Sequence, residues 1–234
     1  QEVEPNDGAP QDTILAALVG NPTMTAEALG TVYVDQYYAS YGNNQTQSAA
    51  DLGADYASLR TAVDGFAAAL LANGAANAAG IQAARTAVQD FDFDYYIDLY
   101  DFASRVQANV ANAAIDNAAA AVMAALGPAT IHEHHGAAWP GAHGLSIYFP
   151  KTLGEYDARY DGTYGFLQFT AATQWDEWLR AYYAYGTGPA TLGKTTPADG
   201  ATGVATSPTL SWGAVAGALW YGYCYDTTDN DACD

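Results

Sequence analysis

Apolar and polar positions alternate most regularly at residues 143–150, HGLSIYFP. Leu145, Ile147 and Phe149 recur with the period of two that is typical of a β-strand with one apolar face. Pro150 ends the predicted strand because proline has no N–H to donate to a neighbouring strand. Helical patterns lie on both sides of the strand and no partner strand is obvious. We therefore expect the rest of its sheet to lie outside this chain.

Elsewhere, apolar residues recur at intervals of three and four, as on the buried face of a helix. Helices are predicted over residues 12–18, 25–41, 56–71, 79–88, 97–110, 113–126 and 173–183; this spacing supports 25–41, 56–71, 97–110 and 173–183, and 113–126 is rich in alanine. Thr25 is a suitable N-cap for the second of these helices. Thr173 and Asp176 resemble a capping box at the start of the last one. Residues 127–141 are rich in Gly, His and Pro and predict a loop.

Near the end of the chain, the pattern changes from helices to short strands and turns. Residues 209–212 and 219–225 predict two short strands separated by turns, which resemble the opening strands of a bacterial fibronectin type III or immunoglobulin-like module. Such a sandwich needs about 100 residues, so we expect a truncated module. The predicted organisation is an α/β domain, a linker and this module, over residues 1–186, 187–195 and 196–234.

The charge balance excludes some partners. The chain has 26 acidic and 7 basic residues and a formal net charge of −19, whereas nucleic acids and anionic membranes bind clustered Lys and Arg. No apolar run reaches the ~20 residues of a membrane span.

Cys224 and Cys233 lie close together, which favours a small-loop disulfide and secretion; two unpaired thiols without a role are the alternative. Gln1 is not a natural initiator, so we expect a fragment or processed form.

Several segments together resemble the clostripain-like cysteine peptidases, a family of caspase/gingipain-type fold. The most specific is GLSIYFP at residues 144–150. The others follow in the order that the family shows: EVEPNDG at 2–8, NPTMT at 21–25, DLYDFA at 98–103 and the helix around Trp175 and Trp178. The resemblance covers residues 1–185 and implies an α/β fold with a partial caspase-like sheet and a large helical layer.

The resemblance also implies a function. The family cleaves peptides after basic residues, Arg above all, with a His/Cys dyad whose thiolate attacks the peptide carbonyl. Both dyad residues are expected before Gln1, so this chain should lack catalytic residues and be inactive alone. Its expected partners are the N-terminal portion of the same peptidase domain and a peptide or protein substrate with a basic residue before the cleaved bond. The expected location is secreted or on a bacterial cell surface.

The family places the first segment of this chain along the specificity pocket. Asp7 is therefore expected to pair with the guanidinium of the substrate Arg. Glu4 and Glu2 are weaker candidates for the same contact, because alternation puts both on one face of a strand. The structural alternative is that Asp7 only shapes the turn in which it lies.

Two groups of residues suggest binding sites for metal cations. Asp90, Asp92 and Asp94 could contribute to a calcium site, which the calcium-dependent members of the family imply, although the chain should not require calcium. A solvated cluster at a helix end is the alternative. The run HEHH at residues 132–135 suggests zinc, but it is not HExxH and Gly136 follows at once. We predict solvated histidines in a loop there and no metal site; a metal hydrolase is the third hypothesis.

No residue of this chain is expected to act as a nucleophile. DAC at residues 231–233 copies the family's nucleophile tripeptide, but its acidic surroundings disfavour the thiolate of Cys233. His143 needs a nucleophile within hydrogen-bond reach to carry a proton, and Ser146 lacks a nucleophile-elbow pattern, so His143 is predicted to be structural.

The alternative to the peptidase hypothesis is a secreted non-enzymatic binding or adhesion protein, favoured by the acidity, the 18 tyrosines and the appended module.

Overall fold

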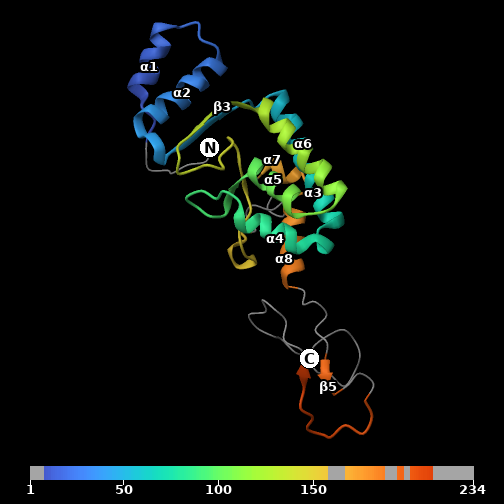
Figure 1. The fold of residues 1–234 in the computed structure, drawn as a ribbon. Coiled ribbons are helices and arrows are strands. Elements are labelled where there is room, and N and C mark those ends of the chain that lie inside the picture. The colour runs from blue at the N-terminus through green and yellow to red at the C-terminus, as the bar shows by residue number, and fades with distance from the viewer. Residues whose placement is uncertain (1–7, 158–166, 188–193, 198–200, 213–234) are drawn as a thin grey trace. The chain divides into compact units, whose positions relative to one another are not determined.

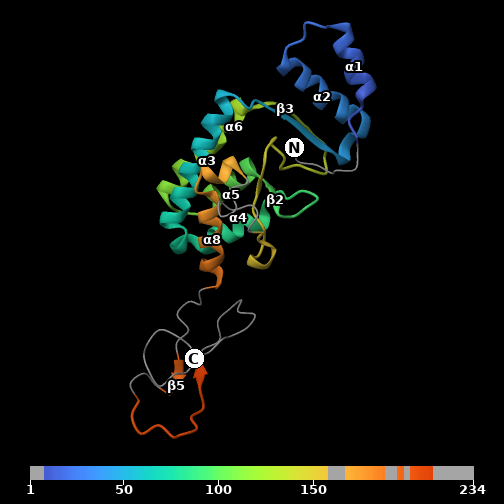
Figure 2. The same ribbon diagram turned by 180° about the vertical axis from the view of Figure 1, so that it is seen from behind.

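The structure is a computed structural model that describes residues 8–157, 167–187, 194–197 and 201–212. The chain divides into two compact units, Gln1–Tyr185 and Gly186–Asp234. The described residues form a mixed α/β fold in which helices predominate and the strands pair into small antiparallel sheets (Figures 1 and 2). The α/β class expected from the sequence is therefore confirmed.

Most of the chain's regular structure is helical. The α-helices are α1 (Gln11–Gly20), α2 (Ala26–Tyr41), α3 (Ala54–Asn73), α4 (Ala78–Ala87), α5 (Leu99–Asn109), α6 (Ala113–Ala129), α7 (Gln168–Ala171) and α8 (Trp175–Thr187). Short 3₁₀ turns are η1 (Gly42–Asn44), η2 (Ala75–Asn77) and η3 (Leu153–Glu155). The strands are β1 (Thr46–Ala50), β2 (Tyr96–Asp98), β3 (Thr130–His135), β4 (Ser146–Tyr148), β5 (Lys194–Thr196) and β6 (Ser211–Trp212).

Local capping fixes where several helices begin. The Thr25 hydroxyl accepts a hydrogen bond from the Ala28 N–H at 3.2 Å, as the sequence predicted for α2. The Asn112 side chain accepts two N–H groups in the first turn of α6, at 3.0 and 3.1 Å. Each cap satisfies N–H groups that a helix start otherwise leaves without an intrahelical partner.

The start of α8 is held by a tertiary contact in addition to local ones. The Gln174 N–H donates to the Asp64 carboxylate of α3 at 2.9 Å, and the Thr173 hydroxyl donates to the Phe169 carbonyl at 2.9 Å. The sequence placed Thr173 in a capping box and gave no sign of Asp64. A carboxylate at a helix N-terminus is favourable because it faces the positive end of the helix dipole.

One apolar core lies among α3, α4, α5, α6, α8 and the pair β2–β4, and Figures 1 and 2 show these helices grouped together. Phe149 lies at its centre, fully buried, with ring centroids 4.9 Å from Tyr182, 5.0 Å from Trp178 and 5.3 Å from Phe102. These edge-to-face contacts add to the free energy gained by removing large apolar surfaces from water. The stripe predicted on α3 is buried at Leu59, Val63, Phe66 and Leu70.

The predicted strand exists as β4, but its partner lies inside this chain. β4 pairs antiparallel with β2, with Ile147 opposite Ile97. Two expectations were therefore wrong: that no partner is present, and that the helix of α5 begins at residue 97. Apolar spacing over so short a run does not distinguish a strand from a helix, and here the strand leads directly into the helix.

The predicted loop over residues 127–141 is also wrong in part. Thr130–His135 forms β3, which pairs antiparallel with Thr46–Ala50 in β1. Helix α2 packs on this pair. Neither strand alternates apolar and polar residues, so the pattern that identified β4 was missing from both.

In the second unit, β5 pairs antiparallel with β6, so residues 211–212 of one predicted strand are confirmed. The other predicted strand, residues 219–225, lies outside the described residues. No helix in the described part of the chain combines the length and the apolar character that crossing a membrane requires.

Candidate functional site

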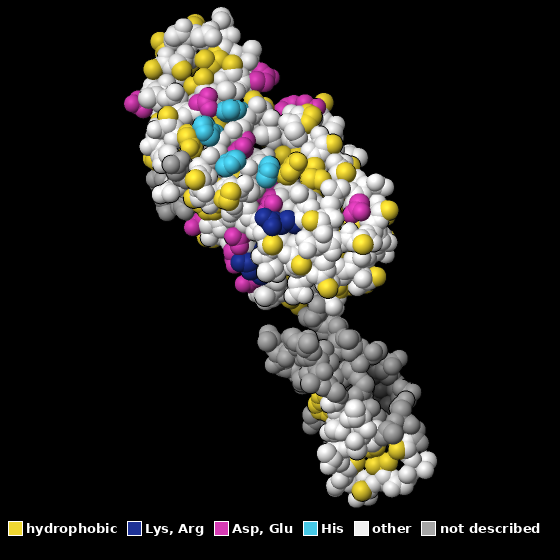
Figure 3. Space-filling model, viewed as in Figure 1, with side chains coloured by type: hydrophobic (Ala, Val, Ile, Leu, Met, Phe, Trp, Pro, Cys, Tyr) yellow, Lys and Arg dark blue, Asp and Glu magenta, His cyan; other side chains and the backbone are white. Residues whose placement is uncertain are grey.

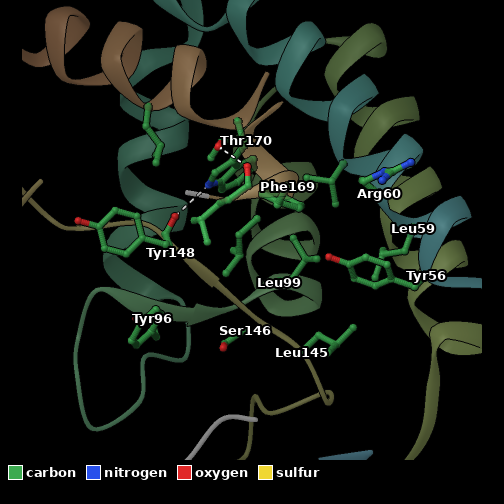
Figure 4. A pocket seen from close by; sticks show the side chains of 15 residues that line it. Tyr56, Leu59, Arg60, Tyr96, Leu99, Leu145, Ser146, Tyr148, Phe169 and Thr170 are labelled. Atoms are coloured by element: carbon green, nitrogen blue, oxygen red, sulfur yellow. Dashed lines mark hydrogen bonds between the residues drawn. The ribbon is translucent and has the colours of Figure 1, made fainter. Parts of the chain in front are cut away.

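An apolar pocket of about 290 Å³ lies beside β4. Figure 4 shows its walls: side chains of α3, among them Tyr56 and Arg60, face those of β4 and of the segment around Phe169. The Trp175 indole N–H donates to the Tyr148 carbonyl at 2.9 Å, which holds α8 against β4 at one wall. The lining residues are Tyr56, Leu59, Arg60, Val63, Tyr96, Leu99, Leu145, Ser146, Ile147, Tyr148, Leu167, Phe169, Thr170, Trp175 and Leu179.

The lining decides which ligands this pocket suits. Arg60 is the one charged residue among the described lining residues, and no carboxylate is among them. A guanidinium would therefore meet no counter-charge in this pocket, whereas an apolar group would meet aromatic and aliphatic surface. The pocket beside β4 is thus suited to an apolar group and is distinct from an Arg-specific pocket.

A second feature is the buried carboxylate of Asp98, at the junction of β2 and α5. It caps α5 by accepting the Asp101 N–H at 2.7 Å, and it accepts the backbone N–H of His143 at 2.7 Å. Asp98 has no solvent exposure. A buried carboxylate is tolerated when such hydrogen bonds replace its hydration, so Asp98 joins three segments of chain at one point.

The same carboxylate orients the imidazole of His143. Nδ1 lies 2.8 Å from the Gly141 carbonyl and 3.2 Å from Asp98, so Nδ1 carries the proton and Nε2 is the acceptor in the neutral ring. The Tyr100 ring stacks on the imidazole with centroids 4.4 Å apart. The hydrogen bond to Asp98 raises the pKa of His143, against the opposing effect of partial burial. The predicted structural role of His143 fits these contacts.

Asp90 and Asp94, two of the three proposed calcium ligands, face an ammonium group. Lys151 Nζ lies 3.0 Å from Asp90 and 2.9 Å from Asp94, and hydrogen bonds to both carboxylates raise its pKa. The ammonium therefore occupies the position between these carboxylates that a cation would take. Asp92 is exposed and has no part in this cluster.

The histidines of residues 132–135 are brought together with a residue that the sequence did not suggest. His132 Nε2 lies 2.8 Å from the Asp35 carboxylate of α2, and His134 Nδ1 lies 3.7 Å from the same oxygen. One ligand atom from each of the three residues lies within 4.8 Å of the others. Figure 3 shows the histidine side chains, in cyan, gathered on one face of the molecule with acidic side chains near them.

The expected substrate contacts and the expected disulfide fall on residues that the structure does not describe. Asp7, Glu4 and Glu2 lie outside the described residues, as do Cys224 and Cys233. Asp35 is the site residue that sequence reasoning missed. It stands 97 positions before His132, and an acidic residue on a helix carries no signal of its eventual neighbour.

The described residues thus define a mixed α/β protein with an aromatic helical core, an apolar pocket beside β4 and a half-exposed His/Asp cluster. Comparison with protein-family models, with curated proteins and with solved structures found no match to this chain.

Proposed function

We propose that this chain is the C-terminal part of a secreted bacterial clostripain-like cysteine endopeptidase domain that cleaves after basic residues, Arg above all. In this proposal it supplies scaffold and part of the substrate pocket, and the His/Cys dyad belongs to the N-terminal portion of the domain. The observation that carries the proposal is the order of the family-like segments, with GLSIYFP as the most specific of them.

The contacts between these segments support the proposal. DLYDFA begins at the end of β2, which pairs with the β4 strand of GLSIYFP through Asp98 opposite Ser146. The Leu99 N–H donates to the Leu145 carbonyl at 3.0 Å, and the Trp helix α8 contacts β4 through Trp175. Segments that are far apart in the sequence therefore pack on one another, as parts of one structural unit would.

The finer features of the fold belong to the same proposal. β2 and β4 form a two-stranded sheet among the described residues, and this pair packs on the helical core. The N-terminal portion of the domain would add the remaining strands of a caspase-like sheet. Asp7, with Glu4 and Glu2 beside it, would bind the substrate guanidinium, and residues 196–234 would begin a fibronectin- or immunoglobulin-like module. Calcium would not be required by this chain.

The first test is to sequence the coding DNA upstream of the Gln1 codon. The proposal expects an open frame that encodes one strand ending in His and a later apolar strand ending in Asp-x-Cys. A signal peptide that runs directly into Gln1 would overturn it, because the domain would then have no dyad.

The second test is enzymatic. This chain alone should not hydrolyse an Arg-peptide substrate, whereas co-expression with the upstream segment should give hydrolysis that a thiol-alkylating reagent abolishes. Asp7→Asn should then lower kcat/KM for Arg substrates by at least about tenfold, because the buried guanidinium loses its counter-charge. Asp12→Asn, at an exposed position of α1, is the matched control and should leave kcat/KM unchanged.

A non-enzymatic binding protein is the second candidate, and the apolar pocket beside β4 is the observation that favours it. The probe is the fluorescent dye 8-anilinonaphthalene-1-sulfonate, which combines apolar rings with one negative charge. Saturable binding that is weakened by Leu167→Glu, at the pocket, would support this candidate. Leu153→Glu, at an exposed position away from the pocket, is the control. Equal dye binding by the two variants would contradict the binding-protein candidate.

A further inference from the structure

The strand β3 arranges the four residues of HEHH in a way that a loop would not. Successive side chains of a strand point to opposite faces, so His132 and His134 share one face, and Glu133 and His135 share the other. The contacts agree, because both even-numbered imidazoles approach Asp35 of α2. We propose that Asp35, His132 and His134 form a binding site for one divalent cation of the zinc class.

The distances fit such a site. In a tetrahedral zinc site with bonds of about 2.0–2.1 Å, neighbouring ligand atoms are about 3.3 Å apart. Asp35 Oδ1 lies 2.8 Å from His132 Nε2, which is a hydrogen-bond distance, and 3.7 Å from His134 Nδ1, and all three donor atoms lie within 4.8 Å of one another. Small side-chain rotations would bring the three donor atoms around one ion.

The donor atoms select the metal. Two imidazole nitrogens and one carboxylate oxygen suit Zn²⁺ and its neighbours Co²⁺, Ni²⁺ and Cu²⁺. Ca²⁺ and Mg²⁺ prefer shells made of oxygen atoms, which this cluster does not provide. The site therefore differs in both residues and metal from the calcium expectation at Asp90, Asp92 and Asp94.

Helix α2 also orients one of the ligands. Tyr38 lies three residues after Asp35, on the same face of the helix, and its ring stacks on His134 with centroids 3.5 Å apart and planes 14° apart. An imidazole held flat against an aromatic ring loses less conformational freedom when it binds a metal. One turn of α2 thus supplies both a ligand and the support of another ligand.

Simple ion pairing explains this arrangement less well. The side chains of His132, His134 and Asp35 are 33%, 40% and 51% exposed, and ion pairs so exposed contribute about 0–1 kcal/mol. A divalent cation held by two neutral imidazoles and one carboxylate satisfies all three groups.

The exposure further indicates what kind of site this would be. Three protein ligands leave at least one coordination position, and the half-exposed side chains leave it open to water. The ion would connect α2 to β3 and so tie the helix to the β1–β3 pair. This inference does not depend on the peptidase proposal.

The test is a calorimetric titration of the metal-free chain with ZnCl₂, on protein that carries no histidine tag. One zinc ion per chain should bind, and His132→Asn, His134→Asn and Asp35→Asn should each weaken binding at least about tenfold. Co²⁺ in place of Zn²⁺ should give the visible absorption of a protein-bound cobalt complex in the parent chain, and each variant should lose it.

Matched controls separate this site from other zinc ligands. His135 pairs with Glu133 on the opposite face of β3, so His135→Asn should bind zinc as the parent chain does. Cys224 and Cys233 are alternative zinc ligands, so the double variant Cys224→Ser/Cys233→Ser should also retain the site. Absence of one-to-one binding, or binding that survives His132→Asn and His134→Asn, would overturn the proposal.

Discussion

Single residues at the ends of β2 and β4 determine how these strands meet the rest of the chain. Gly144 has φ = +103°, a conformation that residues with a Cβ rarely adopt, and a Cβ placed there would lie 2.7 Å from Thr130. Asp98 satisfies N–H groups of the following helix and of the segment before β4. The first residue of GLSIYFP and the first of DLYDFA therefore each have a physical reason for their identity.

Gly144→Ala should lower the free energy of unfolding by about 1–3 kcal/mol, because the backbone strain and the contact with Thr130 act together. Urea denaturation measures it. Gly65→Ala is the control, since Gly65 lies exposed in α3 with open space around it, and alanine there should stabilise by about 0.4–1 kcal/mol. Equal effects of the two substitutions would contradict the assigned role of Gly144.

His143 should make stability depend on pH. Its pKa is raised in the folded state by the hydrogen bond to Asp98, so protonation favours folding. The contribution is fully present below the ordinary imidazole pKa of about 6.5 and is lost as pH rises through the folded-state pKa. Between pH 5.5 and 8.5, the parent chain should therefore lose more unfolding free energy than His143→Gln, as measured by urea denaturation. Parallel profiles would show that the imidazole contributes nothing.

At the scale of elements, Arg85 joins α4 to the end of β4. It is buried, and its Nε donates to the Phe149 carbonyl at 2.8 Å while Nη2 donates to the Asp94 carbonyl at 2.6 Å. The guanidinium carbon lies 5.2 Å from the centroid of the Phe149 ring. Burial lowers the pKa of Arg85, yet the side chain of an arginine stays charged in proteins. One side chain thus holds a helix, a strand end and a loop together.

Arg85→Leu should lower the free energy of unfolding by about 2–4 kcal/mol, because two carbonyls lose charged donors and one of them is buried. Arg60→Leu is the matched control, since Arg60 is half-buried and donates to no backbone carbonyl among the described residues, and it should change stability by less than about 1 kcal/mol. Urea denaturation measures both free energies. A stable Arg85→Leu variant would show that other contacts hold β4.

At the scale of the whole molecule, charge opposes compactness. The chain carries 26 acidic and 7 basic residues, and the ion pairs of Lys151 and Arg105 neutralise only a few carboxylates. Net self-repulsion destabilises a folded chain, and mobile ions screen it. The same charge favours the binding of cations such as the proposed zinc ion.

Raising NaCl from 10 to 200 mM should therefore increase the urea concentration at the midpoint of unfolding. Screening weakens the few attractive pairs, but it weakens the far more numerous repulsions as well. The slope of the unfolding free energy against urea concentration reports the surface exposed on unfolding. This slope should stay unchanged and serves as the internal control. A fall in the midpoint would mean that local ion pairs outweigh the net charge.

Local patterns were sufficient wherever a residue and its nearest neighbours decide the outcome. Thr25 identified the start of α2, the apolar stripe identified α3, and the alanine-rich run identified α6. Local sequence patterns did not predict β1 and β3, whose side chains show no alternation, or β2, which is only three residues long. These strands exist because a distant segment supplies the hydrogen bonds, and no local pattern records that partner.

The sequence by itself determined the helices, the strand at Ile147, the acidity of the molecule and the presence of histidines in HEHH. The tertiary structure alone decided that β2 pairs with β4, that Lys151 takes the place between Asp90 and Asp94, and that Asp35 meets His132 and His134. The reason is physical: periodicity and capping are local energies, whereas strand pairing and side-chain clusters depend on contacts between segments that only the folded chain brings together.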